Sequence, residues 1–282
     1  MTDPFLIQGP AIISVSMGLS SGMLLRKIQQ AHGGELPDDV KVAIANTGKE
    51  REESLRFGYE MCDRWGIEPV WVEYRSAPEP KDRWTQVTYE TASRRGEPFE
   101  AVIRDKGQAS QYLPNPVARY CTIELKIRPI KLYAQSLGWA HWDVAMGLRA
   151  DEPARVARAK ARAESGKEPF TQVMPLHEAK VVTADVGVFW SQQNFGLPLP
   201  RINGKTPHGN CDLCFLKGAK TISELMRQDP DRARWWIDRE RETGNTFRID
   251  RPSYAAMLKA VQDQVPFDFG DADELNDCVC GE

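Results

Sequence analysis

Short apolar runs alternate with amphipathic stretches along the first half of the chain, and this alternation constrains the fold most. The apolar runs lie at 11–15 (AIISV), 40–46 (VKVAIAN), 68–74 (EPVWVEY) and 142–148 (WDVAMGL). Their length and composition are typical of buried strands. Stretches with apolar residues at three and four spacing lie between them, at 20–31, 50–65 and 122–137. Strands that alternate with helices predict a doubly wound, mainly parallel α/β sheet with helices on both faces.

The pattern weakens in two parts of the chain. The interval from about 76 to 118 contains several prolines and little sustained periodicity, so we expect a loop-rich insertion that covers the site. After residue 171 the pattern turns irregular, and we expect the parallel sheet to have ended. The prediction is a nucleotide-binding α/β domain over 1–175, completed by a helical, cysteine-bearing region over 176–282. Within that region, Thr221 and Glu224 have capping-box spacing and predict a helix over 221–228.

Composition excludes several classes of protein. No run of about 18 apolar residues occurs, which argues against a transmembrane helix, and the first residues lack the basic and apolar parts of a secretory signal. We therefore expect a cytoplasmic protein without a membrane partner. The net charge is −3, so no global field attracts nucleic acid. Basic residues outnumber acidic ones at 149–167, a segment that either faces phosphates or is simply solvated.

The first apolar run leads into SVSMGLSSGMLL, a loop of small residues that opens a helix. A helix N-terminus with accessible backbone N–H groups binds phosphate well, and the hydroxyls of this loop add donors. Small residues at this place also suit an ordinary tight turn, so the loop alone leaves both interpretations open.

Four segments, in order, resemble motifs of the adenine nucleotide alpha-hydrolase superfamily, which includes ATP pyrophosphatases and phosphoadenosine phosphosulfate (PAPS) reductases. They are Ser16-Met17-Gly18-Leu19-Ser20-Ser21, Asn46-Thr47-Gly48-Lys49-Glu50, Met146-Gly147-Leu148-Arg149 and Thr183-Ala184-Asp185-Val186. The resemblance implies an adenine nucleotide at the carboxyl ends of the strands. It assigns the nucleotide to Ser14, Ser16, Met17, Gly18, Leu19, Ser20, Ser21, Asn46, Thr47, Gly48, Gly147 and Arg149.

The phosphate loop departs from the pyrophosphatase pattern at two positions. Ser20 stands at the acidic position and Leu19 at a usual lysine position. A metal-assisted ATP pyrophosphatase loses expected helpers through these changes, whereas the reductases carry serine-rich loops without the aspartate. Within the superfamily the loop therefore favours the PAPS reductases.

The six cysteines occur in a chain without a secretory signal, which favours metal ligands, a reactive thiol or buried apolar residues over disulfides. Cys211 and Cys214 have C-x-x-C spacing, which serves either one metal or cluster or a redox dithiol. Cys121 lies in RYCTIELKIRPI, which resembles the cysteine segment of cluster-bearing adenylyl-sulfate reductases, with Thr122 replacing the second cysteine. The resemblance implies a 4Fe–4S cluster, with zinc as the alternative. Its ligands would be Cys121, Cys211, Cys214 and either Cys280 or Cys278.

The same tail offers a second role. Reductases of the family carry a nucleophilic cysteine near the C-terminus, and Cys280-Gly281 retains the C-G of that motif. The catalytic candidates are therefore Cys280 and Cys278. A thiolate there would attack the sulfur of a sulfonucleotide, release the nucleotide and form an S-sulfonated cysteine. A thioredoxin-like thiol donor would then release sulfite.

The sequence therefore predicts a PAPS-reductase-like iron–sulfur oxidoreductase that binds a small nucleotide substrate and releases sulfite. One alternative is an ATP-pyrophosphatase-type sulfurtransferase that modifies a nucleic acid or a small molecule. Another is a non-catalytic nucleotide-binding protein with a structural metal. The sequence leaves the acceptor, the electron donor and the oligomeric state open.

Overall fold

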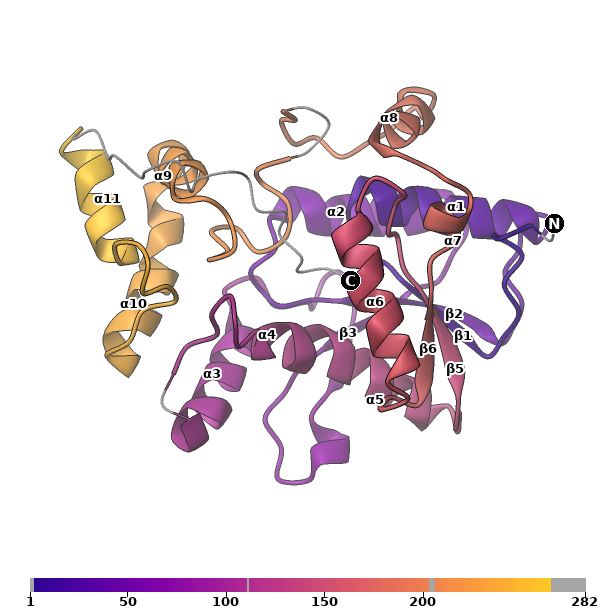
Figure 1. Ribbon diagram of the computed structural model, residues 1–282, viewed down its shortest axis with the longest axis horizontal. Coiled ribbons are helices and arrows are strands. Elements are labelled where there is room, and N and C mark those ends of the chain that lie inside the picture. The colour runs from indigo at the N-terminus through magenta and orange to yellow at the C-terminus, as the bar shows by residue number, and fades with distance from the viewer. Residues whose placement is uncertain (1–2, 111, 203–205, 265–282) are drawn as a thin grey trace.

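The computed structural model of the chain describes residues 3–110, 112–202 and 206–264 (Figure 1). In these residues a six-stranded sheet has the order β4-β3-β2-β1-β5-β6. Its strands are β1 (Ala11–Ser14), β2 (Val40–Ala45), β3 (Val70–Glu73), β4 (Thr85–Val87), β5 (Trp142–Ala145) and β6 (Phe170–Val173). All neighbouring pairs are parallel except β3 and β4. The fold is a doubly wound α/β fold, as predicted.

The sheet extends beyond the predicted strands at both edges. The four apolar runs form β1, β2, β3 and β5, whereas β6 pairs in parallel with β5 over residues 170–173. The sequence therefore fails to predict β6, although the sheet ends at Val173, close to the point where the pattern turns irregular. Only the first residue of β6, Phe170, is buried, and the edge position lets Thr171 and Gln172 keep polar side chains. A strand of this kind leaves no apolar run in the sequence.

The predicted helices of the first half are present, and the third is interrupted. They are α1 (Leu19–Ala31), α2 (Glu52–Arg64) and a composite of α4 (Tyr120–Thr122), a π-helical segment η2 (Ile123–Ile127) and α5 (Arg128–Ser136). Successive residues of β1 enter different cores. Ile13 packs with residues of α1 and α2, and Ile12 packs with residues of α5 and α6 (Pro153–Glu164). The sheet therefore carries helices on both faces.

Two segments have more regular structure than expected. The interval 76–118 includes a short 3-10 turn (Pro80–Asp82), strand β4 and helix α3 (Glu97–Ser110). The basic segment 149–167 contains helix α6, whose buried face consists of Val156 and Ala159 alone. So few apolar positions leave only a weak helical signal in the sequence.

The C-terminal part packs on α3 and on the segment around Cys121, and together they form a second core, which we call the C-terminal core. Two short helices, α7 (Pro175–Glu178) and α8 (Thr183–Ser191), precede the C-terminal part. That part contains α9 (Ala219–Gln228), a 3-10 turn (Pro230–Arg232), α10 (Ala233–Thr243) and α11 (Tyr254–Gln262). Helix α9 begins at Ala219 with Gly218 as its N-cap, so the predicted capping box at Thr221 is wrong. None of the helices in the described part of the chain is long and apolar enough to cross a membrane.

Candidate active site

The strand order reverses direction at the carboxyl end of β1. The chain moves outward from β1 through β2 and β3 on one side, and later adds β5 and β6 on the other. Open parallel sheets bind ligands at such a switch point. Three of the segments that resemble family motifs follow β1, β2 and β5, and these strands are direct neighbours. The fold therefore brings the loop at 14–21, the segment 46–48 and the segment 146–149 to one edge.

The loop after β1 is held by the hydroxyl of Ser21. The backbone N–H groups of Ser16 and Gly18 donate to Ser21 Oγ at 3.2 and 3.3 Å, and that hydroxyl donates to the Gly18 carbonyl at 3.0 Å. Met17 has a φ of 58°, a left-handed conformation that costs energy in a residue with a side chain. Its side chain is buried beside Gly58 of α2, where an added Cβ would lie 2.6 Å from Met17 Cγ. Packing on α2 thus stabilises the strained loop residue.

The segment after β5 contacts the same loop at two points. Gly147 approaches so closely that an added Cβ would lie 3.0 Å from both the backbone N and Cα of Ser21. Arg149 donates from NH1 to Ser20 Oγ at 2.7 Å. Its guanidinium also pairs with Asp151 at 2.9 Å and with Glu152 at 3.2 Å. Arg149 therefore places a positive charge against the loop, although two carboxylates share that charge.

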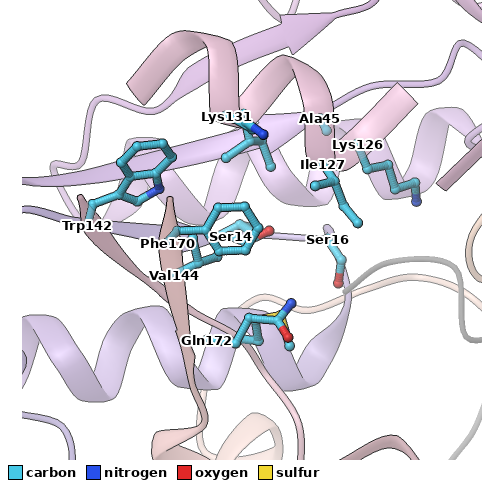
Figure 2. A pocket seen from close by; sticks show the side chains of 13 residues that line it. Ser14, Ser16, Ala45, Lys126, Ile127, Lys131, Trp142, Val144, Phe170 and Gln172 are labelled. Atoms are coloured by element: carbon cyan, nitrogen blue, oxygen red, sulfur yellow. The ribbon is translucent and has the colours of Figure 1, made fainter. Parts of the chain in front are cut away.

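A mainly apolar pocket lies beside the loop, between the sheet and η2 with α5 (Figure 2). Ser14 and Ser16 line it at the loop, and Lys126 adds a charged group. The remaining lining residues are Val15, Ala45, Ile127, Ile130, Lys131, Trp142, Val144, Met146, Phe170 and Gln172. An apolar cleft with a few polar groups is suited to a nucleoside. Of the predicted nucleotide-binding residues, Ser14 and Ser16 line this pocket.

The segment after β2 is buried and bonded within the protein. Asn46 donates to Glu73 Oε1 at 2.6 Å and to the Ser93 carbonyl at 2.8 Å. Its own Oδ1 accepts from the Gly48 N–H at 3.1 Å. Gly48 has a φ of 76°, which favours glycine, and an added Cβ would lie 3.0 Å from the backbone of Gly96. These bonds shape the turn, while its nucleotide-binding role stays a prediction.

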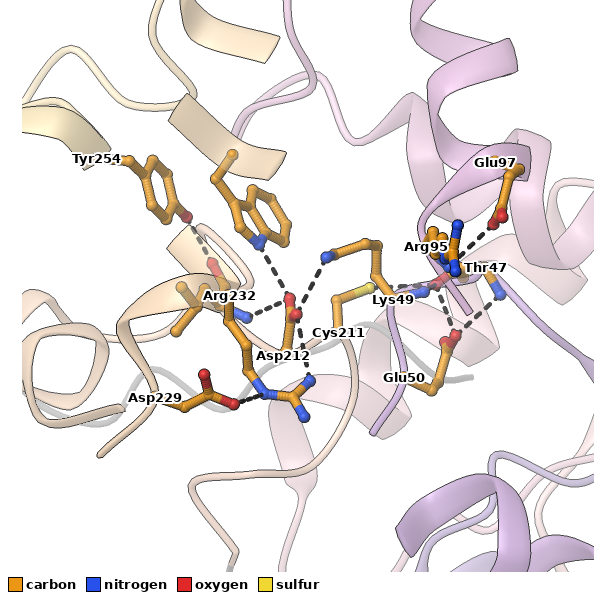
Figure 3. Close-up of polar contacts among 12 residues, drawn as sticks. Thr47, Lys49, Glu50, Arg95, Glu97, Cys211, Asp212, Asp229, Arg232 and Tyr254 are labelled. Atoms are coloured by element: carbon orange, nitrogen blue, oxygen red, sulfur yellow. Dashed lines mark hydrogen bonds and ion pairs between the residues drawn. The ribbon is translucent and has the colours of Figure 1, made fainter. Parts of the chain in front are cut away.

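The turn at 46–50 is attached directly to the cysteine loop at 209–217 (Figure 3). Thr47 Oγ1 lies 3.5 Å from Cys211 Sγ and donates to Glu50 Oε2 at 2.8 Å. The backbones of Glu50 and Cys211 form an isolated β-bridge. The Asp212 N–H donates to the Lys49 carbonyl at 2.8 Å. The C-x-x-C pair is therefore fixed to the edge of the sheet that carries the phosphate loop.

Three of the predicted metal ligands share one buried cluster. Cys121, Cys211 and Cys214 all belong to the C-terminal core and are at most 6% exposed. Across residues 3–110, 112–202 and 206–264, no group of three His, Cys, Asp or Glu side chains is arranged to hold a single metal ion. The role of these three cysteines as ligands of an iron–sulfur cluster therefore stays a prediction. Cys278 and Cys280 lie outside the described residues.

Cys62 behaves as a core residue, as its place in α2 predicts. It is 1% exposed within the sheet core, and burial raises the pKa of its thiol to about 12. It is therefore unsuited to ligation or nucleophilic attack at neutral pH.

Buried charges organise the cysteine loop. The Lys217 ammonium donates to the carbonyls of Gly209, Cys211 and Asp212 at 2.8, 2.6 and 2.9 Å. The Asp212 carboxylate pairs with Lys49 at 3.1 Å and accepts from Trp236 Nε1 at 2.9 Å. Figure 3 shows the ion pair between Lys49 and Asp212. Together these contacts fix the backbone of the loop from both sides.

Charges of both signs surround this loop. Burial, followed by the charges of Arg51 and Lys217, lowers the pKa of His208 to about 4, so the imidazole is neutral at pH 7. Burial and the charge of Arg232 lower the pKa of Arg51 from its ordinary value, against the opposing effect of the carboxylates of Glu53, Asp212 and Asp229.

Sequence reasoning missed the charged residues that hold the loop. In the sequence, Lys49 belongs to a motif and Asp212 lies between two cysteines, and neither position indicates that the residue holds the loop. Lys217 follows Cys214 by three residues in CDLCFLK, and a lysine so close to a buried C-x-x-C is the one available signal. Its burial to 5% exposure depends on tertiary packing.

Comparisons with known proteins give little further identification. No protein-family model matches the chain, and no curated protein matches its sequence. Among solved structures, the chain is similar to the U34-tRNA thiolase NcsA from Methanococcus maripaludis with its 4Fe-4S cluster, at 12% sequence identity and a TM-score of 0.42. The match covers 96% of this chain and 80% of that chain. The class of the fold follows from the strand order and the crossovers described above.

Proposed function

We propose that this chain is an adenine-nucleotide-dependent sulfurtransferase of the PP-loop type with an iron–sulfur cluster. Cys121, Cys211, Cys214 and one of Cys278 and Cys280 would hold the cluster. The observation that carries the proposal is the contact of 3.5 Å between Thr47 Oγ1 and Cys211 Sγ. It attaches the cysteine loop to the same end of the sheet at which the phosphate loop lies. Nucleotide and cysteines would then serve one reaction.

Arg149 supports ATP as the nucleotide. The sequence lacks a lysine at Leu19 and an acid at Ser20, but the guanidinium of Arg149 reaches Ser20 Oγ at 2.7 Å. A cation at this place stabilises negative charge that develops on a pyrophosphate leaving group. The site would therefore regain part of the electrostatic help that the loop sequence lacks.

The chain's own residues have distinct tasks in this proposal. The small-residue loop Ser16–Ser21 binds the phosphates, and the pocket along Val144 and Met146 orients the nucleoside. Arg149 holds charge at the phosphates. The burial of Cys211 and Cys214 excludes water from the thiolates. When bound, the cluster supplies the chemistry that carries sulfur.

A reductase is the second candidate, because the serine-rich loop with Leu19 and Ser20 resembles reductase loops. The two candidates release different products. Anaerobically reconstituted protein is given ATP, sulfide and a nucleic-acid acceptor, or PAPS with a reduced dithiol, and pyrophosphate and sulfite are measured. Pyrophosphate without sulfite is the expected result. Sulfite alone establishes the reductase, and tight nucleotide binding without either product establishes a binding protein.

Iron content tests the ligand set separately. Cys121→Ser, Cys211→Ser and Cys214→Ser should each lower the iron content and the broad visible absorbance of the reconstituted protein. Cys62→Ser is the matched control, because this thiol is equally buried but lies in the sheet core. Full iron content in all three variants would remove these cysteines from the proposal.

A further inference from the structure

A second cleft opens beside the nucleoside pocket, between the segment 117–127 and helix α6. The two clefts share Ile127, Met146 and Gln172, so they are continuous. The charged residues that line the second cleft are all arginines, with no acid among its lining residues. We call the surface formed by Arg119, Arg155, Arg158, Arg162 and Arg248 the basic groove.

The basic groove continues toward the cysteine loop. A third cleft shares Arg119, Arg155 and Arg158 with the second one and extends to Arg248 and Leu216. Leu216 follows Cys214 by two residues. Asp151 and Glu152 also line this end, and they pair with Arg149 and Arg155. The path thus runs from the nucleoside pocket to the loop that carries the predicted ligands.

Two arginines of the groove do not stabilise the fold through polar contacts. Arg158 and Arg162 form no ion pair or side-chain hydrogen bond anywhere in the described part of the chain. Like charges four residues apart on a helix destabilise it slightly. Helix α6 is held to the sheet by Val156 and Ala159. The two guanidiniums are therefore available to an anionic ligand.

The groove favours a ligand with several phosphates in a row. A mononucleotide in the first pocket places its 5′-phosphates at the loop 14–21 and cannot also span the two further clefts. Arginines from the segment before Cys121 and from α6 line the same cleft, which suits an extended polyanion that enters between them. Val117 and Ile123, exposed by 96% and 45%, add apolar surface against which bases can pack. Since the net charge is −3, this basic surface is a local feature.

We infer that the basic groove binds single-stranded nucleic acid and leads it past the nucleotide pocket to the cysteine loop. The inference rests on the proposed function, because it names the acceptor of the sulfur. Guanidinium groups bind the phosphodiesters without reading the sequence. The base to be modified would lie near the junction of the first and second clefts, beside Met146 and Gln172.

The test compares two double variants that remove equal charge. Arg158→Ala with Arg162→Ala changes the groove, whereas Lys160→Ala with Lys167→Ala removes two cations that line none of the three clefts. Fluorescence anisotropy measures the binding of a labelled single-stranded RNA and of the same sequence as DNA over a series of KCl concentrations. The arginine variant should bind about tenfold more weakly at 0.1 M KCl, with a salt slope smaller by about 1.4. The lysine variant should bind like the wild type.

Equal losses in the two double variants would overturn the inference, and so would a wild type that binds neither oligonucleotide. A difference between the RNA and DNA arms identifies which nucleic acid is preferred. Pyrophosphate release from ATP by the wild type, measured with sulfide and a saturating amount of the bound oligonucleotide as acceptor, tests the proposed function separately from binding. Oligonucleotide binding without pyrophosphate would keep the groove and reject the sulfurtransferase.

Discussion

Replacement of Lys217 by methionine tests how the cysteine loop is held. The ammonium is 5% exposed and donates to three buried carbonyls. Hydrogen bonds from a charged donor contribute about 1.5–3 kcal/mol each, but burial of the ammonium offsets part of this gain. Removal of one partner from a buried charged interaction costs about 3–5 kcal/mol. We therefore expect a loss of about 3 kcal/mol in the free energy of unfolding, at the lower end of that range.

Urea unfolding, followed by tryptophan fluorescence, measures this loss. Trp236 reports on the loop directly, because its Nε1 donates to Asp212. The melting temperature should fall by roughly 6 to 10 °C. Lys160→Met makes the same chemical change at an exposed site of α6 and should leave the unfolding curve unchanged. A loss below about 1 kcal/mol in Lys217→Met would refute the argument that this ammonium organises the loop.

Two further predictions concern the phosphate loop and pH. Gly147→Ala should weaken nucleotide binding by about tenfold in calorimetry, because the new Cβ meets the backbone of Ser21 at 3.0 Å, a cost of the order of 1–3 kcal/mol. Gly187→Ala, in α8 with open space around it, should instead raise helix stability slightly. The pKa of His208 is about 4 in the folded protein and 6.5 ordinarily, so the unfolded chain binds a proton more readily. The free energy of unfolding is therefore kept in full above pH 6.5 and falls as the pH drops toward 4. Between pH 7 and pH 5 the wild type should therefore lose more unfolding free energy than His208→Gln, and equal losses would contradict this assignment.

The sequence predicted the centre of the fold better than its edges. Strands β1, β2, β3 and β5 are buried and leave apolar runs. Strand β6 lies at the edge, and its Thr171 and Gln172 carry no such signal. Helix α6 has only Val156 and Ala159 buried in the core, so its sequence does not indicate a helix clearly. Local patterns of apolar residues indicate buried elements, so they do not predict a helix or strand that buries few side chains.

The sequence names candidate site residues, whose roles stay predictions, but not the contacts between them. The order of the motifs predicts that the segments after β1, β2 and β5 form one site. The parallel sheet places these segments at the same end of neighbouring strands. The link between Thr47 and Cys211 joins residues 164 positions apart, and no local pattern encodes such a contact. The same holds for Arg149 and Ser20, which are 129 positions apart.

The turn at 46–50 connects the two halves of the proposed reaction. Its N-terminal part follows β2 beside the phosphate loop, and its Lys49 and Glu50 pair with the cysteine loop through Asp212 and the bridge to Cys211. Asn46 and Thr47 are at most 1% exposed, so a shift of this turn would disturb bonds on both sides. A buried segment of this kind keeps a fixed spacing between the loop after β1 and the thiols. Transfer chemistry needs that spacing, because effective catalysis depends on reacting groups held in a defined geometry.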